Sequence, residues 1–192
     1  MSVKATCFGS IGRRGLGGTL LAALAARKAA AAGGIEKLII HPTPVPLPPD
    51  LTFTDAAGTV RHFAQWRGRA LVVNFWATWC PPCVAEMPAL DRLHAALARE
   101  GIEVLALSND RGGAAVVAPF YQRTGLRHIG IWLDPRGATG RALGVRVLPT
   151  TIILDRRGAE VARLLGDAEW DRADVIAAIR RLAGPARSDQ AA

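Results

Sequence analysis

The run that most constrains the fold is ALVVNFWA, residues 70–77, because it is almost entirely apolar and rich in β-branched and aromatic side chains. Such a run predicts a strand buried on both faces. Only two residues separate it from the sequence CPPC, and apolar residues then recur at every third or fourth position over 84–99. That spacing predicts a helix. A buried strand that leads directly into a helix indicates an α/β fold.

The rest of the chain continues this alternation of strand and helix. Apolar patterns bounded by Gly and Pro define each further element. In chain order we expect a hairpin at 51–63, a strand at 102–109, a helix at 113–125, a strand at 129–135, a short helix at 137–145, a hairpin at 150–166 and a helix at 170–182. Strands that alternate with helices and end in a hairpin predict a sheet packed on both faces.

The first 32 residues read as a targeting segment. They hold five basic residues and no acidic one, and Arg13-Arg14 precede an uncharged run at 15–26. This run has the length of the apolar region of a signal peptide and is shorter than the ~20 residues that span a bilayer. The arginine pair resembles a twin-arginine export signal. We expect residues 1–32 to be an export signal or an N-terminal membrane anchor, with a disordered tail as the plain alternative.

Proline enrichment predicts a linker after this segment. The sequence HPTPVPLPPD, residues 41–50, is unsuited to a helix or a central strand and favours a stiff, extended spacer. We therefore expect a linker at 33–50. One folded domain follows at 51–183, which is an ordinary domain length, and residues 184–192 are expected to form a flexible tail.

The net charge of +8 is weak evidence for nucleic-acid binding. Without the first 32 residues, 19 basic residues face 16 acidic ones. The remaining arginines are scattered along the sequence, with few aromatic residues between them. This pattern favours a solvated, mildly basic surface. We expect no nucleic-acid partner.

The close cysteine pair is the candidate chemical centre. A disulfide between Cys80 and Cys83 closes too short a loop to stabilise a fold, and the third cysteine, Cys7, lies in the targeting segment. A zinc site would need two further ligands, and no second CxxC exists. Copper(I), which accepts two thiolates, is the stronger metal alternative. We expect redox chemistry that needs no metal and no cofactor.

The two cysteines are expected to have different roles. The order of strand, CPPC and helix places Cys80 at a helix N-terminus, where the helix dipole stabilises a thiolate. Cys83 lies one turn further along and is expected to be shielded. Exposed Cys80 would then exchange with a partner's sulfur, and Cys83 would resolve the mixed disulfide.

The two prolines between the cysteines favour a reducing site. Proline at the first helical positions has its φ angle already set. Pro81 and Pro82 also remove two N–H donors that would otherwise stabilise a Cys80 thiolate, so the pKa of that thiol should fall less than in a strongly oxidising dithiol. A less stabilised thiolate makes the reduced form less favoured.

The segment VVNFWATWCPPC resembles the active-site segment of the thioredoxin superfamily. More narrowly, residues 51–182 resemble the TlpA/ResA/CcmG group of exported thiol–disulfide oxidoreductases. The resemblance implies a thioredoxin-like α/β fold, in which helices flank a central mixed sheet. It also implies an N-terminal β extension and an inserted helix–strand segment within 109–135.

The resemblance also assigns residue roles. Pro149 in GVRVLPTT is expected to be a cis-proline facing the dithiol, with the Leu148 backbone directed at a partner chain. Glu86 matches a glutamate of this group's active site, where it would influence the thiol pKa values and shuttle a proton. Asn74 stands where thioredoxins carry a buried aspartate, which argues against a proton relay there. Trp79 is expected to cover the disulfide and offer an apolar contact.

These observations together predict an exported thiol–disulfide oxidoreductase that acts mostly as a reductant. The resemblance implies protein substrates with cysteine pairs, such as apocytochrome c or copper-site cysteines, and a membrane thiol-reductase as electron donor. It implies a periplasmic location, either free or tethered at the inner membrane. A net thiol oxidant and a copper-handling protein remain as alternatives.

Overall fold

The structure is a computed structural model that describes residues 37–185. The predicted targeting segment at 1–32 and most of the predicted tail lie outside the described residues. Within the described range, no helix is both long and apolar enough to cross a membrane.

Eight strands and four α-helices make up the described residues, with short 3₁₀ turns at Phe63–Trp66 and Ala98–Glu100. The strands are β1 (Leu38–Pro46), β2 (Thr52–Asp55), β3 (Val60–His62), β4 (Ala70–Trp76), β5 (Ile102–Ser108), β6 (Trp132–Leu133), β7 (Thr150–Leu154) and β8 (Ala159–Leu165). The helices are α1 (Pro81–Leu97), α2 (Ala114–Thr124), α3 (Ala138–Ala142) and α4 (Ala173–Ala183).

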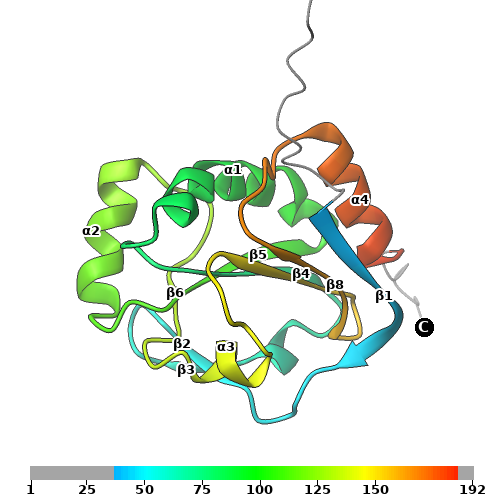
Figure 1. Ribbon diagram of the computed structural model, residues 1–192, viewed down its shortest axis with the longest axis horizontal. Coiled ribbons are helices and arrows are strands. Elements are labelled where there is room, and N and C mark those ends of the chain that lie inside the picture. The colour runs from blue at the N-terminus through cyan, green and yellow to red at the C-terminus, as the bar shows by residue number, and fades with distance from the viewer. Residues whose placement is uncertain (1–36, 186–192) are drawn as a thin grey trace, which may run out of the picture. The chain divides into compact units, whose positions relative to one another are not determined.

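All eight strands belong to one mixed sheet, in the order β1-β8-β7-β4-β5-β6-β2-β3. Strands β4, β5 and β6 run parallel, whereas β7 pairs antiparallel with β4. Helices α1 and α4 lie on one side of the sheet, and α3 lies on the other (Figure 1). The predicted α/β fold, in which helices flank a central mixed sheet, is confirmed.

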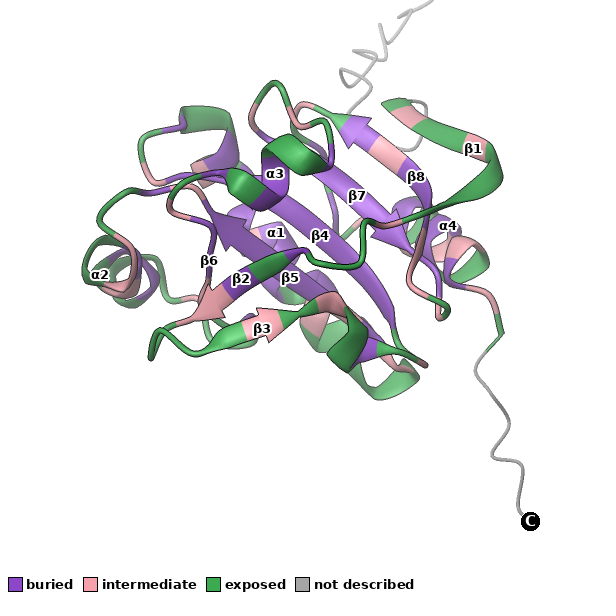
Figure 2. Ribbon diagram, turned by 90° about the horizontal axis from the view of Figure 1, so that it is seen from below, coloured by how far each residue is buried: buried purple, intermediate pink, exposed green. Residues whose placement is uncertain are grey.

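Strand β4 is buried along its whole length, as its apolar run predicts (Figure 2). Its alternate residues contribute to two separate cores. Val72 and Trp76 join the core shared with α1 and α4, while Leu71, Val73 and Phe75 join the core on the opposite face. A strand packed on both faces holds its C-terminal end firmly, and the cysteine pair follows that end.

The linker expectation is wrong for residues 38–46, because they form β1, which pairs antiparallel with β8. Strand β1 lies at the edge of the sheet, where proline is tolerated because one side of the strand needs no ladder donors. The pairing is interrupted between Ile40 and Val45. The side chain of His41 also lies 2.8 Å from a carboxylate oxygen of Glu160.

The predicted additions to the fold are present. The β2–β3 hairpin pairs antiparallel, and β2 extends the sheet through β6. Helix α2 and strand β6 form the inserted segment between β5 and α3. This insertion borders the site, since the loops around it follow the C-terminal ends of parallel strands.

Candidate active site

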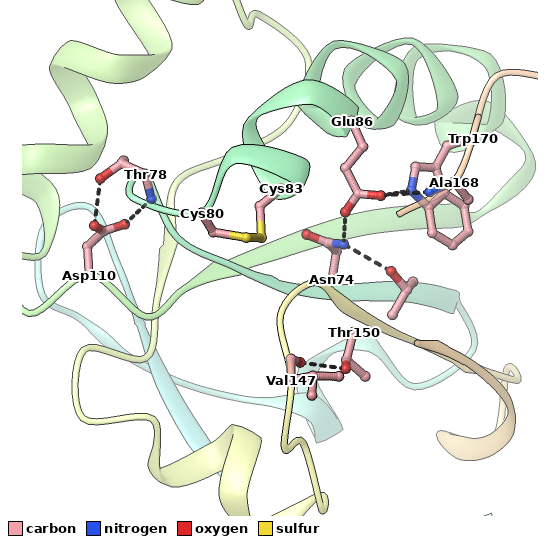
Figure 3. Close-up of a disulfide and its surroundings, with 11 residues drawn as sticks. Asn74, Thr78, Cys80, Cys83, Glu86, Asp110, Val147, Thr150, Ala168 and Trp170 are labelled. Atoms are coloured by element: carbon pink, nitrogen blue, oxygen red, sulfur yellow. Dashed lines mark hydrogen bonds between the residues drawn. A yellow bond between two sulfur atoms is a disulfide. The ribbon is translucent and has the colours of Figure 1, made fainter. Parts of the chain in front are cut away.

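Cys80 and Cys83 form a disulfide at the start of α1 (Figure 3). Cys80 is the N-cap residue of the helix, and Pro81 and Pro82 occupy its first two positions. The Cys80 carbonyl accepts the N–H of Val84, which opens the helical hydrogen-bond ladder. The sequence therefore predicted the position of the pair correctly: a strand end, a tight turn and a helix N-terminus.

Cys80 is less exposed than the sequence suggested, whereas Cys83 is shielded as expected. Cys80 is 5% exposed and Cys83 is 0% exposed in this oxidised state, so the expectation of an openly exposed Cys80 needs correction. The disulfide turns the Cys80 sulfur inward toward Cys83. The expected order is retained, because Cys80 lines a surface depression and Cys83 does not.

That hollow, the dithiol depression, has a volume of about 460 Å³. It is lined by Trp79, Cys80, Pro81, Pro82, Asn109, Val145, Arg146, Val147 and Leu148. Five residues predicted for the site thus meet at one surface, and Trp79 is 66% exposed beside it. The sequence did not point to Asn109 or to residues 145–147 as part of this depression, because they lie on loops that are far apart in the chain.

The Leu148–Pro149 peptide is cis, as expected from the resemblance. Pro149 is buried, and its carbonyl accepts the N–H of Gly166. Leu148 is half-buried and lines the depression. Its backbone N–H and C=O make no hydrogen bond with any residue in 37–185. An unpaired peptide beside a sulfur offers backbone groups to an extended partner chain.

The buried Asp110 fixes the loop that carries Trp79 and Cys80. Its carboxylate accepts the Thr78 N–H at 2.9 Å, the Thr78 hydroxyl at 2.6 Å and the Ser108 hydroxyl at 2.7 Å. Sequence reasoning missed this residue. The available signal was its position directly after a predicted strand parallel to the one before CPPC, since such strand ends meet at one edge.

Glu86 belongs to α1 and lies on the same buried face of the helix as Cys83, three residues further along. It is 4% exposed. One carboxylate oxygen accepts the Asn74 amide at 2.8 Å, and the other accepts the Ala168 N–H at 3.1 Å and the Trp170 indole N–H at 2.7 Å. The hydrogen bond from Trp170 was not foreseen from the sequence, which predicted only a core residue there.

Burial raises the pKa of Glu86 from its ordinary value of 4.5 to about 7. Desolvation of the carboxylate is the main cause, and the nearby Asp167 adds to it. The three hydrogen bonds favour the charged form and oppose the shift. Glu86 is therefore a buried acid that changes protonation state near neutral pH.

Asn74 lies between the disulfide and Glu86 (Figure 3). Its amide group also donates to the hydroxyl of Thr151 at 2.9 Å, whereas its carbonyl oxygen is buried without a hydrogen-bond partner. Figure 3 shows this oxygen on the side of the disulfide. An amide does not titrate, so Asn74 orients Glu86 and does not carry a proton.

The parent protein should lose stability as the pH rises from about 4.5 to 7. We expect a Glu86→Gln variant to abolish this loss. Folded Glu86 binds its proton more tightly than unfolded Glu86, so raising the pH across this window favours unfolding. The full effect is about 3 kcal/mol in the free energy of unfolding. Urea titrations of the parent and the variant at several pH values measure it.

The matched control is Glu169→Gln, because the Glu169 side chain is 63% exposed. This variant should keep the pH slope of the parent. If parent and Glu86→Gln showed parallel stability curves from pH 4 to 8, Glu86 would not be the buried acid described above.

The described residues contain no cluster of three or more His, Cys, Asp or Glu side chains able to hold a metal ion. Within residues 37–185, the two cysteine sulfurs are the ligands that a metal at the dithiol would have. This donor set fits a soft ion such as copper(I) and does not complete a zinc site.

Comparisons with known proteins agree with this geometry. The Redoxin family matches residues 45–179. The thiol-disulfide oxidoreductase ResA of Geobacillus thermodenitrificans is 36% identical over 110 residues, which cover 57% of this chain and 62% of that relative. The ResA of Geobacillus kaustophilus is 34% identical over 117 residues, covering 61% and 66%. The chain thus spans slightly less than two thirds of these relatives.

A solved structure shares the fold. The putative thiol:disulfide interchange protein DsbE from Chlorobium tepidum superposes with a TM-score of 0.64 at 24% identity. The match covers 74% of this chain and 99% of that one. Family match and relatives agree, and the fold is consistent with both: the chain belongs to the Redoxin family and, within it, to the thioredoxin-like ResA group.

Proposed function

We propose that this protein is an exported thiol–disulfide oxidoreductase that reduces cysteine pairs in other exported proteins. The observation that carries the proposal is the Cys80–Cys83 pair at a helix N-terminus, with Cys80 in a surface depression and Cys83 behind it. The ResA relatives support the same activity.

The exchange proceeds in two sulfur transfers. The Cys80 thiolate attacks one sulfur of the partner's disulfide, and the other partner sulfur leaves as a thiolate and takes up a proton. Cys83, as a thiolate, then attacks the Cys80 sulfur and releases the second partner thiol. Two electrons pass to the partner, and the protein is left with the Cys80–Cys83 disulfide. An upstream dithiol donor must then reduce it, for which a membrane thiol-reductase is the proposed source.

The two prolines at the helix N-terminus favour the reducing direction, because they weaken the stabilisation of a thiolate there. Pro81 and Pro82 occupy the first two helical positions and have no N–H to donate to a thiolate. Glu86, which is buried near Cys83, acts in the same direction. The negative charge of its carboxylate form disfavours a neighbouring thiolate. We propose that Glu86 takes and returns a proton during the exchange, since its pKa of about 7 suits that task.

The proposed substrates are extended segments that hold a cysteine pair, such as apocytochrome c or copper-site cysteines. The unpaired Leu148 peptide supports a backbone contact with such a segment. The arginine pair and apolar run at the N-terminus support export to the periplasm, with or without a remaining tether.

The redox equilibrium of the pair with glutathione tests the direction of the reaction. We expect a reduction potential below about −200 mV, in the range of glutaredoxins and thioredoxin. Alkylation of free thiols followed by mass spectrometry measures the reduced fraction in each glutathione buffer. A value near −120 mV, typical of a strongly oxidising dithiol protein, would instead make the protein an oxidant.

A copper-handling role makes a different prediction in the same preparation. The reduced protein would keep one copper(I) ion through dialysis, and copper would protect both cysteines from alkylation. If both cysteines were still alkylated after the protein had been loaded with copper(I) and dialysed, this role would be ruled out.

A further inference from the structure

A groove of about 890 Å³ adjoins the dithiol depression on the side of β5, β6 and α3. We call it the arginine groove. Its lining is Trp79, Asn109, Arg111, Pro135, Arg136 and Arg141. It shares Trp79 and Asn109 with the dithiol depression, which itself includes Arg146. One continuous surface thus runs from Cys80 past the exposed Trp79 to a set of arginines.

The positive charge of this surface is not neutralised within the described chain. Arg111, Arg136, Arg141 and Arg146 are all exposed, and none of them forms an ion pair with a residue in 37–185. Seven of the 13 other arginines in residues 37–185 form ion pairs, for example Arg163 with Glu160.

The neighbouring acids do not change this conclusion. Asp110 is buried and bound to the hydroxyls of Thr78 and Ser108. Asp134 is also buried, and it accepts the Gly140 N–H at 2.9 Å. Counting both aspartates against the four arginines still leaves a positive surface beside the dithiol.

The loop before α3 holds two of the arginines in place. An Nη atom of Arg141 donates to the Arg136 carbonyl at 2.5 Å. Gly137 lies between them with a φ of 61°, in the left-handed region. A Cβ at this position would lie 3.0 Å from the Asn109 side-chain oxygen and 3.1 Å from Arg141. The loop thus packs closely against Asn109 on the groove wall.

We propose that the arginine groove binds an acidic segment that flanks the cysteine pair of a protein substrate. The inference deepens the proposed function and rests on it. Guanidinium groups bind carboxylates through paired hydrogen bonds, and exposed charges of opposite sign speed association. A chain whose cysteine lies at Cys80 and whose backbone pairs with Leu148 would extend over Trp79 into the groove.

A protein segment suits this surface better than a nucleic acid does. The groove is continuous with the depression that holds the reactive sulfur, and only a partner with a cysteine pair has a reason to occupy both. Three of the arginines, Arg111, Arg136 and Arg141, lie in the groove on one side of the depression, so most of the acidic residues are expected on one side of the partner's cysteines.

Three synthetic peptides test the proposal. Each has the same disulfide, flanked on one side by a run of glutamates, glutamines or lysines. The full-length reduced protein reduces each peptide at low salt and again at high salt, and the second-order rate constant is measured by thiol release. We expect the glutamate peptide to react about tenfold faster than the lysine peptide at low salt, and the difference to shrink at high salt.

Two double variants remove the same charge from different places. Arg111→Gln/Arg136→Gln changes the groove, where neither side chain makes a hydrogen bond within the described residues. Arg99→Gln/Arg181→Gln changes the far end of the domain, beyond the C-terminus of the 17-residue helix α1 and near the end of α4. The glutamate-to-lysine rate ratio should approach one in the first variant and stay near tenfold in the second.

Equal rates for the three peptides with the parent protein would overturn the proposal. So would equal loss in both double variants, because the effect would then come from net charge alone. Stronger competition by single-stranded DNA than by a glutamate peptide of equal charge would also overturn it. If the parent reduced none of the peptides, including the glutamine one, the proposed function itself would fail.

Discussion

A Cys80→Ser variant is expected to lose at least about 10³-fold in the rate of disulfide reduction, whereas Cys83→Ser is expected to form a lasting mixed disulfide with its substrate. Serine at position 80 removes the sulfur that lines the depression. Serine at position 83 leaves that sulfur in place but removes the group that releases the partner. All variants should carry Cys7→Ser, so that only the pair reacts.

The measurement combines thiol release from a disulfide peptide with mass spectrometry of the protein. The Cys83→Ser protein should gain the mass of one peptide chain, and a reductant should remove it. Timed alkylation of the reduced parent should modify Cys80 before Cys83, because Cys83 is fully buried. Equal and slow alkylation of both, or mixed disulfides that form equally well at either cysteine, would contradict the assigned roles.

A Trp170→Ala variant is expected to lose about 3–5 kcal/mol in the free energy of unfolding. Trp170 is 1% exposed in the core under α1 and α4, and its indole donates to Glu86 at 2.7 Å. The loss should correspond to a melting temperature about 10 °C lower in a chain of this length. The loss should be larger at pH 8 than at pH 5, because the indole hydrogen bond stabilises ionised Glu86 more than protonated Glu86.

Two further tryptophan variants separate the causes. Trp79→Ala removes an exposed ring and should change stability by less than about 0.5 kcal/mol. Trp170→Phe keeps most of the apolar contact and removes the N–H, so its effect should appear mainly above pH 7. Chemical denaturation at both pH values measures all three variants. A Trp170→Ala loss independent of pH would mean that the hydrogen bond to Glu86 contributes little.

Local pattern predicted those parts of the fold in which one strand or helix determines its own environment. The apolar run at 70–77 predicted a strand buried on both faces, and β4 is such a strand. Strand β1 was missed because prolines argue against a strand by themselves. Only pairing with β8 at the sheet edge makes those prolines harmless.

The candidate site divides in the same way. Spacing and helix position identified Cys80 and Cys83, and the resemblance supplied the cis bond at Pro149. Neither predicted that the Asp110 carboxylate ties down the loop before Cys80, or that Trp170 donates to Glu86. These contacts join residues 32 and 84 positions apart, so no local pattern contains them.

The sequence by itself determined the chemistry available at this site: two thiols one helical turn apart, with no N–H on the two residues between them. This follows from covalent structure and helix geometry, which need no information about distant residues. Tertiary structure alone decided how exposed each sulfur is, how far the Glu86 pKa moves and which arginines surround Trp79. Burial, hydrogen bonding and surface charge depend on what packs nearby, and folding brings those neighbours from distant parts of the chain.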